Sequence, residues 1–271
     1  MQKFLILLHT YYVQNKRESL PWRKTKDTYH ILLSEIMLQQ TQVSRVLVKY
    51  DEFLKRFPTV QSLASAPLRD VLTLWQGLGY NRRAKFLHEA SKILNTATKK
   101  DLADYTFLKS LPGVGQSTAG AVLVFTQNKP IVFIETNIRA VLMHHFFKDS
   151  EKVSDKEIAT VLEKLLNNLG DKFTPREFYY ALYDYGTHLK NTLGKEKKAL
   201  HTKSKHYVKQ STFTGSRRQL RAFILKTFLE MKDSKKLAQK VKNTLPTPLH
   251  KYTPQDIEGL IRDLKNEGFF E

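Results

Sequence analysis

Glu35 is a carboxylate whose neighbours in the sequence could change its chemistry. The residues around it are largely apolar and include Ile31, Leu32, Ile36 and Leu38. Removing a carboxyl group from water raises its pKa, so that the group still holds a proton near neutral pH, as a general acid must. The residues alone also allow a plainer interpretation, in which Glu35 is a solvated side chain at the edge of a helix face.

A glycine-containing turn, Leu111-Pro112-Gly113-Val114-Gly115, offers a different chemistry. Two glycines allow a tight turn and leave backbone N–H groups uncovered by side chains. The turn lies between a predicted helix that ends at Phe107-Leu108 and another that is built on Ala119, Val122 and Leu123. The positive end of the second helix would face the same point. Such a turn can bind a backbone phosphate of nucleic acid without reading a base.

The charge of the chain fits such a partner. Its 271 residues include 45 Lys and Arg against 26 Asp and Glu, a formal net charge of +19. This excess favours a polyanion, with nucleic acid first, although it could also serve general solubility. Hydrophobic residues make up 41% of the chain, which is enough for a folded core and excludes a disordered polycation. The absence of cysteine excludes disulfides, a cysteine nucleophile and metal centres held by thiolates.

Helical spacing dominates the segments that must position these residues. Apolar residues recur three or four positions apart through residues 31–54, 87–94, 158–169 and 178–189. This pattern predicts at least about eight short helices and little or no sheet. The longest apolar run near the start, Phe4 to Leu8, is too short to span a bilayer and lacks the features of a secretion signal.

Several segments resemble those of known DNA repair enzymes. The segment from Leu111 to Ala121 resembles the helix–hairpin–helix of the DNA glycosylase superfamily that includes endonuclease III. Three further segments occur in the order typical of the MutY-type adenine DNA glycosylases: Leu20-Pro21-Trp22-Arg23, Ser34 to Val43, and Trp75 to Tyr80 followed by Arg83-Ala84. The Met-Leu-Gln-Gln-Thr run within the second segment is the most diagnostic, and the resemblance covers roughly residues 1–190.

The resemblance implies an all-α, two-lobed helix–hairpin–helix DNA glycosylase fold. One lobe, of six-helix type, would comprise residues 25–130 and end in the hairpin. The second lobe would comprise residues 1–24 and 131–189, and a lysine-rich linker or arm near phosphate would follow at residues 190–210. Residues 211–271 show three short helical patterns, which we expect to form either a winged-helix-like module or a plain helical cap.

The resemblance also implies roles for individual residues. Glu35 would protonate the adenine ring and make it a leaving group, while Glu135 would stabilise the cationic sugar and Asn137 would order the site. Gln39 or Gln40 would enter the base stack vacated by the flipped nucleotide, and Tyr80 would lie beside the opposing base. The residues expected to contact DNA are Arg23, Gln39, Gln40, Thr41, Tyr80, Arg83, Gly113, Val114, Gly115, Gln116, Ser117 and Thr118.

The chain departs from the family pattern at four places. Glu135 stands where the family usually has aspartate, and its side chain is longer by roughly 1.5 Å, so either the backbone compensates or the mechanism differs. Glu135 could instead be an exposed acid at a helix start. Ser117 stands where bifunctional relatives carry a lysine, which predicts base removal without efficient lyase activity. No cysteine is present to hold an iron–sulfur cluster, and residues 211–271 are too short for the mixed α/β domain that senses 8-oxoguanine.

These observations predict a monofunctional DNA glycosylase of base excision repair, which flips out and hydrolyses adenine opposite 8-oxoguanine or guanine. Two alternatives stay open: a glycosylase for thymine or uracil opposite guanine, and a non-catalytic DNA-binding protein on the same scaffold. The expected partner is double-stranded DNA with a mismatch or an oxidised base, and no membrane is expected to take part. The protein is expected to act as a monomer in the cytoplasm, associated with a bacterial-type nucleoid. No cofactor or metal is expected, because the pairs His144 with His145 and His201 with His206 lack a convincing third ligand.

Overall fold

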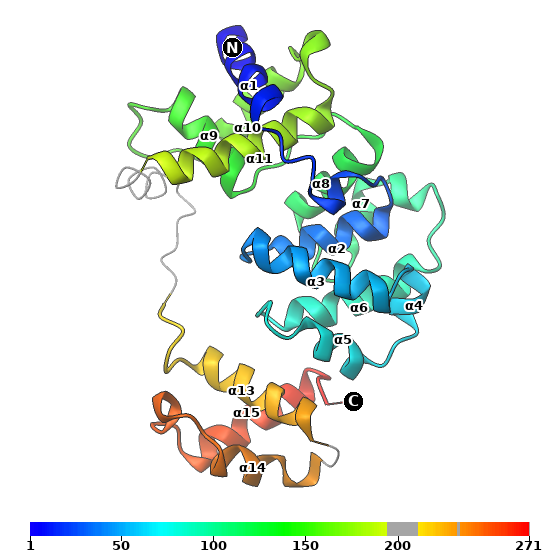
Figure 1. The fold of residues 1–271 in the computed structure, drawn as a ribbon, viewed down its shortest axis with the longest axis vertical. Helices are drawn as coiled ribbons and strands as arrows, with labels where there is room; N and C mark the ends of the chain where they lie inside the picture. The colour runs from blue at the N-terminus through cyan, green and yellow to red at the C-terminus, as the bar shows by residue number, and fades with distance from the viewer. Residues whose placement is uncertain (194–210, 232–233, 271) are drawn as a thin grey trace. The chain divides into compact units, whose positions relative to one another are not determined.

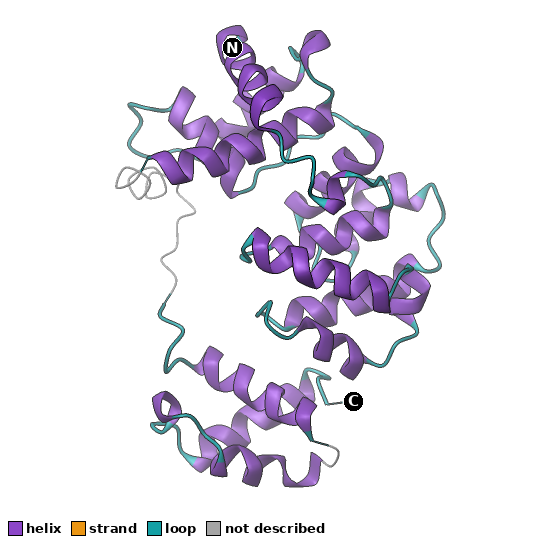
Figure 2. Ribbon diagram, viewed as in Figure 1, coloured by secondary structure: helices purple, strands orange, loops and turns teal. Residues whose placement is uncertain are grey.

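The computed structural model of the chain describes residues 1–193, 211–231 and 234–270. Every regular element within these ranges is an α-helix or a short 3-10 helix, and no β-strand occurs in them (Figure 1, Figure 2). The predicted all-α class is therefore confirmed. Packing between the elements divides the chain into two units, residues 1–35 with 98–209 and residues 36–97 with 210–271.

The first unit is built around α11 (Pro175–Thr192), which packs against α1, α8 and α9 (Figure 1). Aromatic rings fill this interface: Phe125 stacks on Tyr180 with ring centroids 4.5 Å apart, and Phe133 stacks on Tyr179 at 4.1 Å. The remaining helices of the unit are α1 (Gln2–Asn15), most of α2 (Thr28–Leu38), α7 (Tyr105–Ser110), α8 (Gln116–Gln127), α9 (Thr136–Phe146) and α10 (Asp155–Leu166), with 3-10 helices at Pro21–Arg23, Asp101–Ala103 and Gly170–Lys172.

Local sequence signals fix where α10 and α11 begin. The side chains of Ser154 and Thr174 accept the backbone N–H of Glu157 and Glu177, whose carboxylates in turn accept the backbone N–H of the capping residue. These reciprocal bonds satisfy N–H groups that a helix start leaves without partners in the helix. Pro175 occupies the first turn of α11, where its missing N–H costs nothing.

The contact between α9 and α11 is very close at Gly186. A Cβ atom added to Gly186 would lie 2.6 Å from the Cβ of Asn137 and 3.0 Å from its carbonyl oxygen. Only glycine fits at these distances, so residue 186 lets α11 approach the start of α9 directly. This approach fixes the position of Asn137, one of the predicted site residues.

The second unit combines helices from two distant parts of the chain. The helices α4 and α5 pack on α6, α3 packs on α5, and α13, α14 and α15 pack on one another (Figure 1). Trp75 and Phe53 are fully buried in this unit and meet edge to face, with ring centroids 6.1 Å apart. Its helices are α3 (Val43–Arg56), α4 (Val60–Ala64), α5 (Leu68–Trp75), α6 (Arg82–Leu94), α13 (Arg217–Glu230), α14 (Leu237–Asn243) and α15 (Pro254–Asn266), with 3-10 helices at Ser234–Lys236 and Thr247–Leu249.

The helices α13, α14 and α15 form a cap on α5, which we call the C-terminal cap. Arg69 of α5 donates to three backbone carbonyl oxygens at the end of α13. Glu267, just after α15, accepts hydrogen bonds from both Arg82 and Arg221. A winged-helix module would need a β-hairpin, and the described C-terminal residues contain no strand. Of the two predicted alternatives, the helical cap therefore describes the structure.

The division of the chain differs from the predicted lobes. Residues 98–130, including the hairpin, group with the first unit because α8 packs on α11. The C-terminal cap groups with residues 36–97 because α13 packs on α5. These contacts join segments that are far apart in the sequence, and hydrophobic periodicity carries no information about which helices pair.

The first residues of the predicted arm at 190–210 are helical. The helix α11 continues through Lys190 to Thr192, so its last turns belong to the first unit. The rest of the predicted arm, residues 194–210, lies outside the described residues.

The close approach at Gly186 makes a stability prediction. We expect Gly186→Ala to lower the free energy of unfolding by about 1–3 kcal/mol, because the added methyl group has no space against Asn137. Gly259→Ala in α15 is the matched control, since its nearest neighbour would be the far end of Arg262 at 4.0 Å. This control is expected to be neutral or stabilising by up to about 1 kcal/mol. Urea unfolding followed by circular dichroism measures both, and equal midpoints for the two variants would contradict the packing argument.

Candidate active site

Glu35 lies on α2, in the part of that helix that belongs to the first unit. Its side chain is half-buried, while Leu33, Ser34 and Ile36 beside it are buried. Burial first, and the negative charge of Glu135 second, raise the pKa of the Glu35 carboxyl to about 8. Glu35 therefore keeps its proton at neutral pH, unlike a solvated glutamate.

Glu135 immediately precedes α9 and caps its first turn. Its carboxylate accepts the backbone N–H of Asn137 at 2.6 Å and that of Ile138 at 2.9 Å. Burial raises the pKa of the Glu135 carboxyl, whereas these hydrogen bonds and the positive charge of Lys190 oppose that rise. Because the side chain folds back on its own helix, its extra methylene group does not carry the carboxylate away from the helix start. Glu135 is thus a helix cap and also a second carboxylate within electrostatic reach of Glu35.

Asn137 is held between Glu135 and Lys190. The Nζ of Lys190 donates to Oδ1 of Asn137 at 2.5 Å, and Nδ2 of Asn137 donates to Oε2 of Glu135 at 3.4 Å. The ammonium group of Lys190 can only donate, so it must face the amide oxygen of Asn137. The amide nitrogen of Asn137 is then left to face the carboxylate of Glu135. Lys190 comes from the end of α11, and the structure brings it to the site instead of into an arm.

Tyr183, on α11, lies near both carboxylates. Burial raises the pKa of its hydroxyl well above the usual value, and the negative charges of Glu35 and Glu135 raise it further. A group responds to both charges only when it is close to both. The two acids that the sequence places a hundred residues apart therefore come together with Tyr183 in the first unit.

The predicted hairpin is present as α7, a tight turn and α8. Gly113 has a φ of 75°, a conformation that favours glycine, and Leu111 and Val114 are buried beneath the turn. Gly115 and Gln116 are exposed, and no side chain caps α8 at Gly115. A helix start of this kind presents backbone N–H groups that suit a phosphate.

Two hairpin residues face inward. The hydroxyl of Ser117 donates to the carbonyl oxygen of Ile134 at 2.6 Å, and Thr118 is buried. The Ser117 bond ties the start of α8 to the segment that leads into Glu135. The Ser117 side chain therefore connects the hairpin to the segment beside Glu135 within the first unit.

Two loops of the second unit carry the residues predicted to contact DNA at the flipped nucleotide and at the opposing base. Gln39, Gln40 and Thr41 follow α2, and Tyr80 ends the loop before α6. Gln40 and Tyr80 have positive φ values of 55° and 49°, and Tyr80 is 42% exposed. A left-handed backbone costs a residue other than glycine about 1–3 kcal/mol and persists only where the surroundings hold it.

Arg83 holds the two loops together. Its side chain is buried, and its guanidinium group donates six hydrogen bonds of 2.6 to 3.0 Å. The acceptors are the carbonyl oxygens of Ile36, Met37, Gln39, Leu78 and Gly79 and the hydroxyl of Thr41. The predicted direct contact of Arg83 with DNA is not supported by this geometry, because a buried guanidinium group engaged with both loops does not reach a phosphate.

A family model of HhH-GPD superfamily base excision DNA repair proteins matches residues 33–168, which is half of the chain. The chain belongs to this superfamily. The match to the HhH-GPD model includes Glu35, both loops, the hairpin, Glu135 and Asn137.

Several curated relatives are named adenine DNA glycosylase. One from Buchnera aphidicola subsp. Baizongia pistaciae is 38% identical over 171 residues, covering 63% of this chain and 48% of the relative. One from Mycobacterium tuberculosis is 40% identical over 132 residues, covering 48% and 43%. One from Arabidopsis thaliana is 31% identical over 214 residues, covering 69% and 34%. The chain thus spans about half the length, or less, of these relatives.

The solved structure of a thermostable thymine-DNA glycosylase is similar to this chain in fold. The TM-score is 0.57, and the similarity covers 68% of this chain and 85% of the other, at 23% sequence identity. Together with the HhH-GPD match, it confirms the predicted helix–hairpin–helix glycosylase fold.

Asp184 of α11 is a buried acid that the sequence pattern did not single out. It is 3% exposed and accepts hydrogen bonds from Arg23 at 2.7 and 2.8 Å and from Nε of Arg17 at 2.6 Å. Arg23, predicted to contact DNA, also lies over the ring of Tyr180 at 4.4 Å and has a side chain only 6% exposed. Its geometry supports a positioning role that fixes the segment before α2 to α11. The sequence did contain a signal for Asp184: this acid falls on the face of α11 that its apolar residues predict to be buried.

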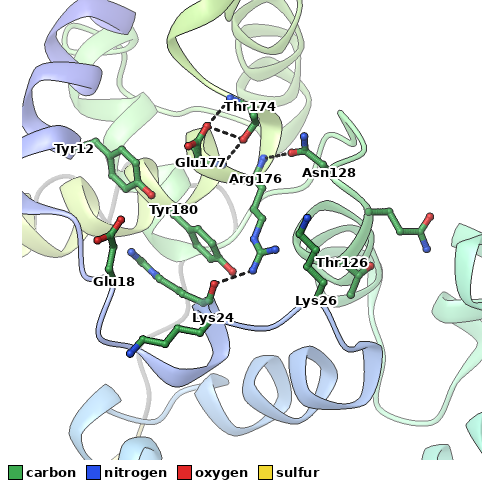
Figure 3. A pocket seen from close by; sticks show the side chains of 12 residues that line it. Tyr12, Glu18, Lys24, Lys26, Thr126, Asn128, Thr174, Arg176, Glu177 and Tyr180 are labelled. Carbon is green, nitrogen blue, oxygen red and sulfur yellow. Dashed lines mark hydrogen bonds between the residues drawn. The ribbon is translucent and has the colours of Figure 1, made fainter.

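A cavity of about 610 Å³ opens beside this cluster (Figure 3). Arg23, Arg176 and Tyr180 are among its lining residues, and Arg176 donates to the carbonyl oxygens of Arg23 and Thr25. Neither carboxylate of the candidate site lines the cavity. The cavity therefore belongs to the surroundings of the Arg23 cluster and not to the two carboxylates.

The described residues bring no metal-binding group of three or more His, Asp or Glu together. His145 lies 3.1 Å from the hydroxyl of Tyr185, and burial lowers the pKa of its ring to about 4. His201 and His206 lie outside the described residues. The sequence contains no cysteine, so its residues do not fit an iron–sulfur cluster held by thiolates. None of the described helices combines the length and the hydrophobicity that a membrane-spanning helix needs.

The raised pKa of Glu35 predicts how stability depends on pH. Between pH 4.5 and about 8, the folded protein holds a proton on Glu35 that the unfolded chain has lost. The free energy of unfolding therefore falls as pH rises through this window. We expect Glu35→Gln to flatten this fall, whereas Glu163→Gln, at an exposed site on α10, leaves it unchanged. Urea unfolding at a series of pH values measures the effect, and an unchanged slope in Glu35→Gln would mean that Glu35 titrates normally.

The Arg83 contacts predict a second stability effect. The single ammonium group of lysine cannot replace the planar guanidinium group of arginine, whose N–H donors point in several directions. Arg83→Lys therefore leaves buried carbonyl groups without donors. We expect a loss of roughly 2 kcal/mol or more in the free energy of unfolding. Arg82→Lys is the neighbouring control, since its side chain is 61% exposed and pairs with Glu267 at the surface. Its effect should stay within about 1 kcal/mol, and a similar value for both variants would argue against a special role of Arg83.

Proposed function

We propose that this chain is a monofunctional DNA glycosylase that hydrolyses the bond between adenine and deoxyribose, with the adenine opposite guanine or 8-oxoguanine. The observation that carries the proposal is a glutamate, Glu35, that keeps its proton at neutral pH next to a second carboxylate, Glu135. Membership of a base excision repair superfamily supports this reading. Adenine as the base is supported by the names of the relatives.

Glu35 acts as the general acid in this proposal. The target nucleotide must leave the duplex before any side chain can reach it. The carboxyl group of Glu35 then donates its proton to a ring nitrogen of adenine, and the electron pair of the C1′–N bond departs with the base. A pKa of about 8 keeps the acid loaded and still able to release its proton.

Glu135 stabilises the sugar once the base leaves. The anomeric carbon becomes cationic, and an ionised carboxylate close to it lowers the energy of that state. Asn137 and Lys190 hold the carboxylate and its surroundings in place. Water adds to the anomeric carbon, its proton passes to a carboxylate of the site, and free adenine and an abasic sugar result.

The other parts of the chain hold the DNA. The hairpin backbone at Gly113 and Gly115 binds phosphate. Gln39 or Gln40 enters the stack at the lesion, and Tyr80 lies beside the opposing base. Ser117 stands where a lysine nucleophile would be, which supports base removal without strand cleavage. We further propose that a monomer acts on duplex DNA with a mismatch or an oxidised base, in the cytoplasm at the nucleoid.

Base excision tests the proposal directly. Labelled duplexes with A:8-oxoguanine, A:G, T:G or U:G pairs are incubated with the protein and analysed for strand breaks with and without alkali. We expect breaks only after alkali, and only in the adenine strands. Glu35→Gln should slow excision by about 100-fold or more, since it removes the transferable proton, while Glu163→Gln should match the wild type.

Each other outcome identifies a different function. Breaks in thymine or uracil strands would assign the chain to another mispaired base, and breaks without alkali would contradict the monofunctional claim. DNA binding without any breaks would leave a non-catalytic DNA-binding protein. Unchanged excision by Glu35→Gln would exclude Glu35 as the acid.

A further inference from the structure

The C-terminal cap contacts Tyr80 through Arg218. Nη1 of Arg218, in the first turn of α13, donates to the hydroxyl of Tyr80 at 3.2 Å. Nη2 of the same side chain donates to the carbonyl oxygen of Ser211 at 2.8 Å. Arg218 thereby joins the chain entering the cap to the loop that the proposed function places in DNA. All these residues belong to the second unit.

The positive charge of Arg218 has no acidic partner among the described residues. The five acids of the cap that the structure describes each have another partner. Glu230 pairs with Lys226, Asp256 caps α15 at Thr253, Glu258 pairs with Lys242, Asp263 pairs with Arg217, and Glu267 pairs with Arg82 and Arg221. Residues 211–271 contain twelve Lys and Arg against seven Asp and Glu. The cap therefore carries surplus positive charge, and within the described part of the chain Arg218 is a position that no acid neutralises.

Two exposed aromatic side chains accompany this charge. Phe213 is 53% exposed and Tyr80 is 42% exposed, two of the few large apolar side chains left open to solvent in the described chain. The Arg218 guanidinium group lies 6.0 Å from the ring centroid of Phe213, at the edge of the range for a cation–π contact. Exposed rings beside an arginine that pairs with no described acid suit nucleic acid, because bases and sugars stack on the rings while the cation meets phosphate.

We propose that Phe213 and Arg218 form a DNA-binding surface with Tyr80, so that the C-terminal cap takes part in holding the duplex. Arg218 contacts a backbone phosphate, and Phe213 packs on an exposed base or sugar. This inference rests on the proposed function, because that function places Tyr80 at the DNA. It adds a contact region outside residues 33–168, the part matched by the superfamily model.

Binding measurements with four variants of the full chain test the surface. Fluorescence anisotropy follows a labelled A:G duplex between about 50 and 200 mM salt, where phosphate contacts determine the slope. Arg218→Ala should weaken binding and reduce the slope of log affinity against log salt by about one, and Arg218→Lys should retain that slope. Phe213→Ala should weaken binding about tenfold with the slope unchanged. Lys226→Ala is the control: it removes one charge from α13 about 12 Å further along the helix, where Lys226 is 61% exposed.

The possible results separate this inference from the proposed function. If the wild type binds and excises adenine while Arg218→Ala and Phe213→Ala behave like Lys226→Ala, the surface is overturned and the glycosylase proposal stands. If the wild type binds no duplex, both are overturned. Thermal unfolding of each variant guards against a folding defect, which side chains as exposed as Phe213 are not expected to cause.

Discussion

Two carboxyl groups in a poorly hydrated site cannot both carry a charge without a large cost in free energy. The first unit is built so that one of its two carboxyl groups is stabilised as the anion and the other is not. Glu135 receives two backbone N–H groups at the start of α9 and the positive charge of Lys190. For Glu35, the causes identified are burial and the repulsion of Glu135, and both favour its protonated form. One acid is thus held as the better-stabilised anion and the other as the proton carrier. This is the asymmetry that glycosidic bond cleavage requires.

Packing maintains that asymmetry. The missing side chain at Gly186 lets α11 approach Asn137, and the same helix supplies Tyr183 and Lys190 to the site. Asp184, on α11 as well, holds the segment before α2 through Arg17 and Arg23. A single long helix therefore positions groups around both carboxylates, and its start is fixed by a local capping box at Thr174.

The sequence predicts the helices of this structure better than it predicts which helices and side chains contact one another. Helical periodicity and the glycine turn were sufficient for the all-α class and the hairpin, because both depend on residues close together in the chain. The neighbours of Glu35 alone allow either a buried acid or a solvated side chain, and its predicted role rests on the resemblance to known glycosylases. Lys190 and Asp184 were missed as site residues because their partners lie 53 and 161 to 167 residues away. The grouping of the C-terminal cap with residues 36–97 was missed for the same physical reason.

The buried guanidinium group of Arg83 has a consequence for the motions of the second unit. Both neighbouring loops, one ending in Gln40 and Thr41 and the other in Tyr80, are bonded to the same rigid, planar group. If one loop opens, the buried guanidinium group loses part of its acceptors and holds the other loop less firmly. Two loops about forty positions apart in the chain are therefore coupled in free energy through a single side chain.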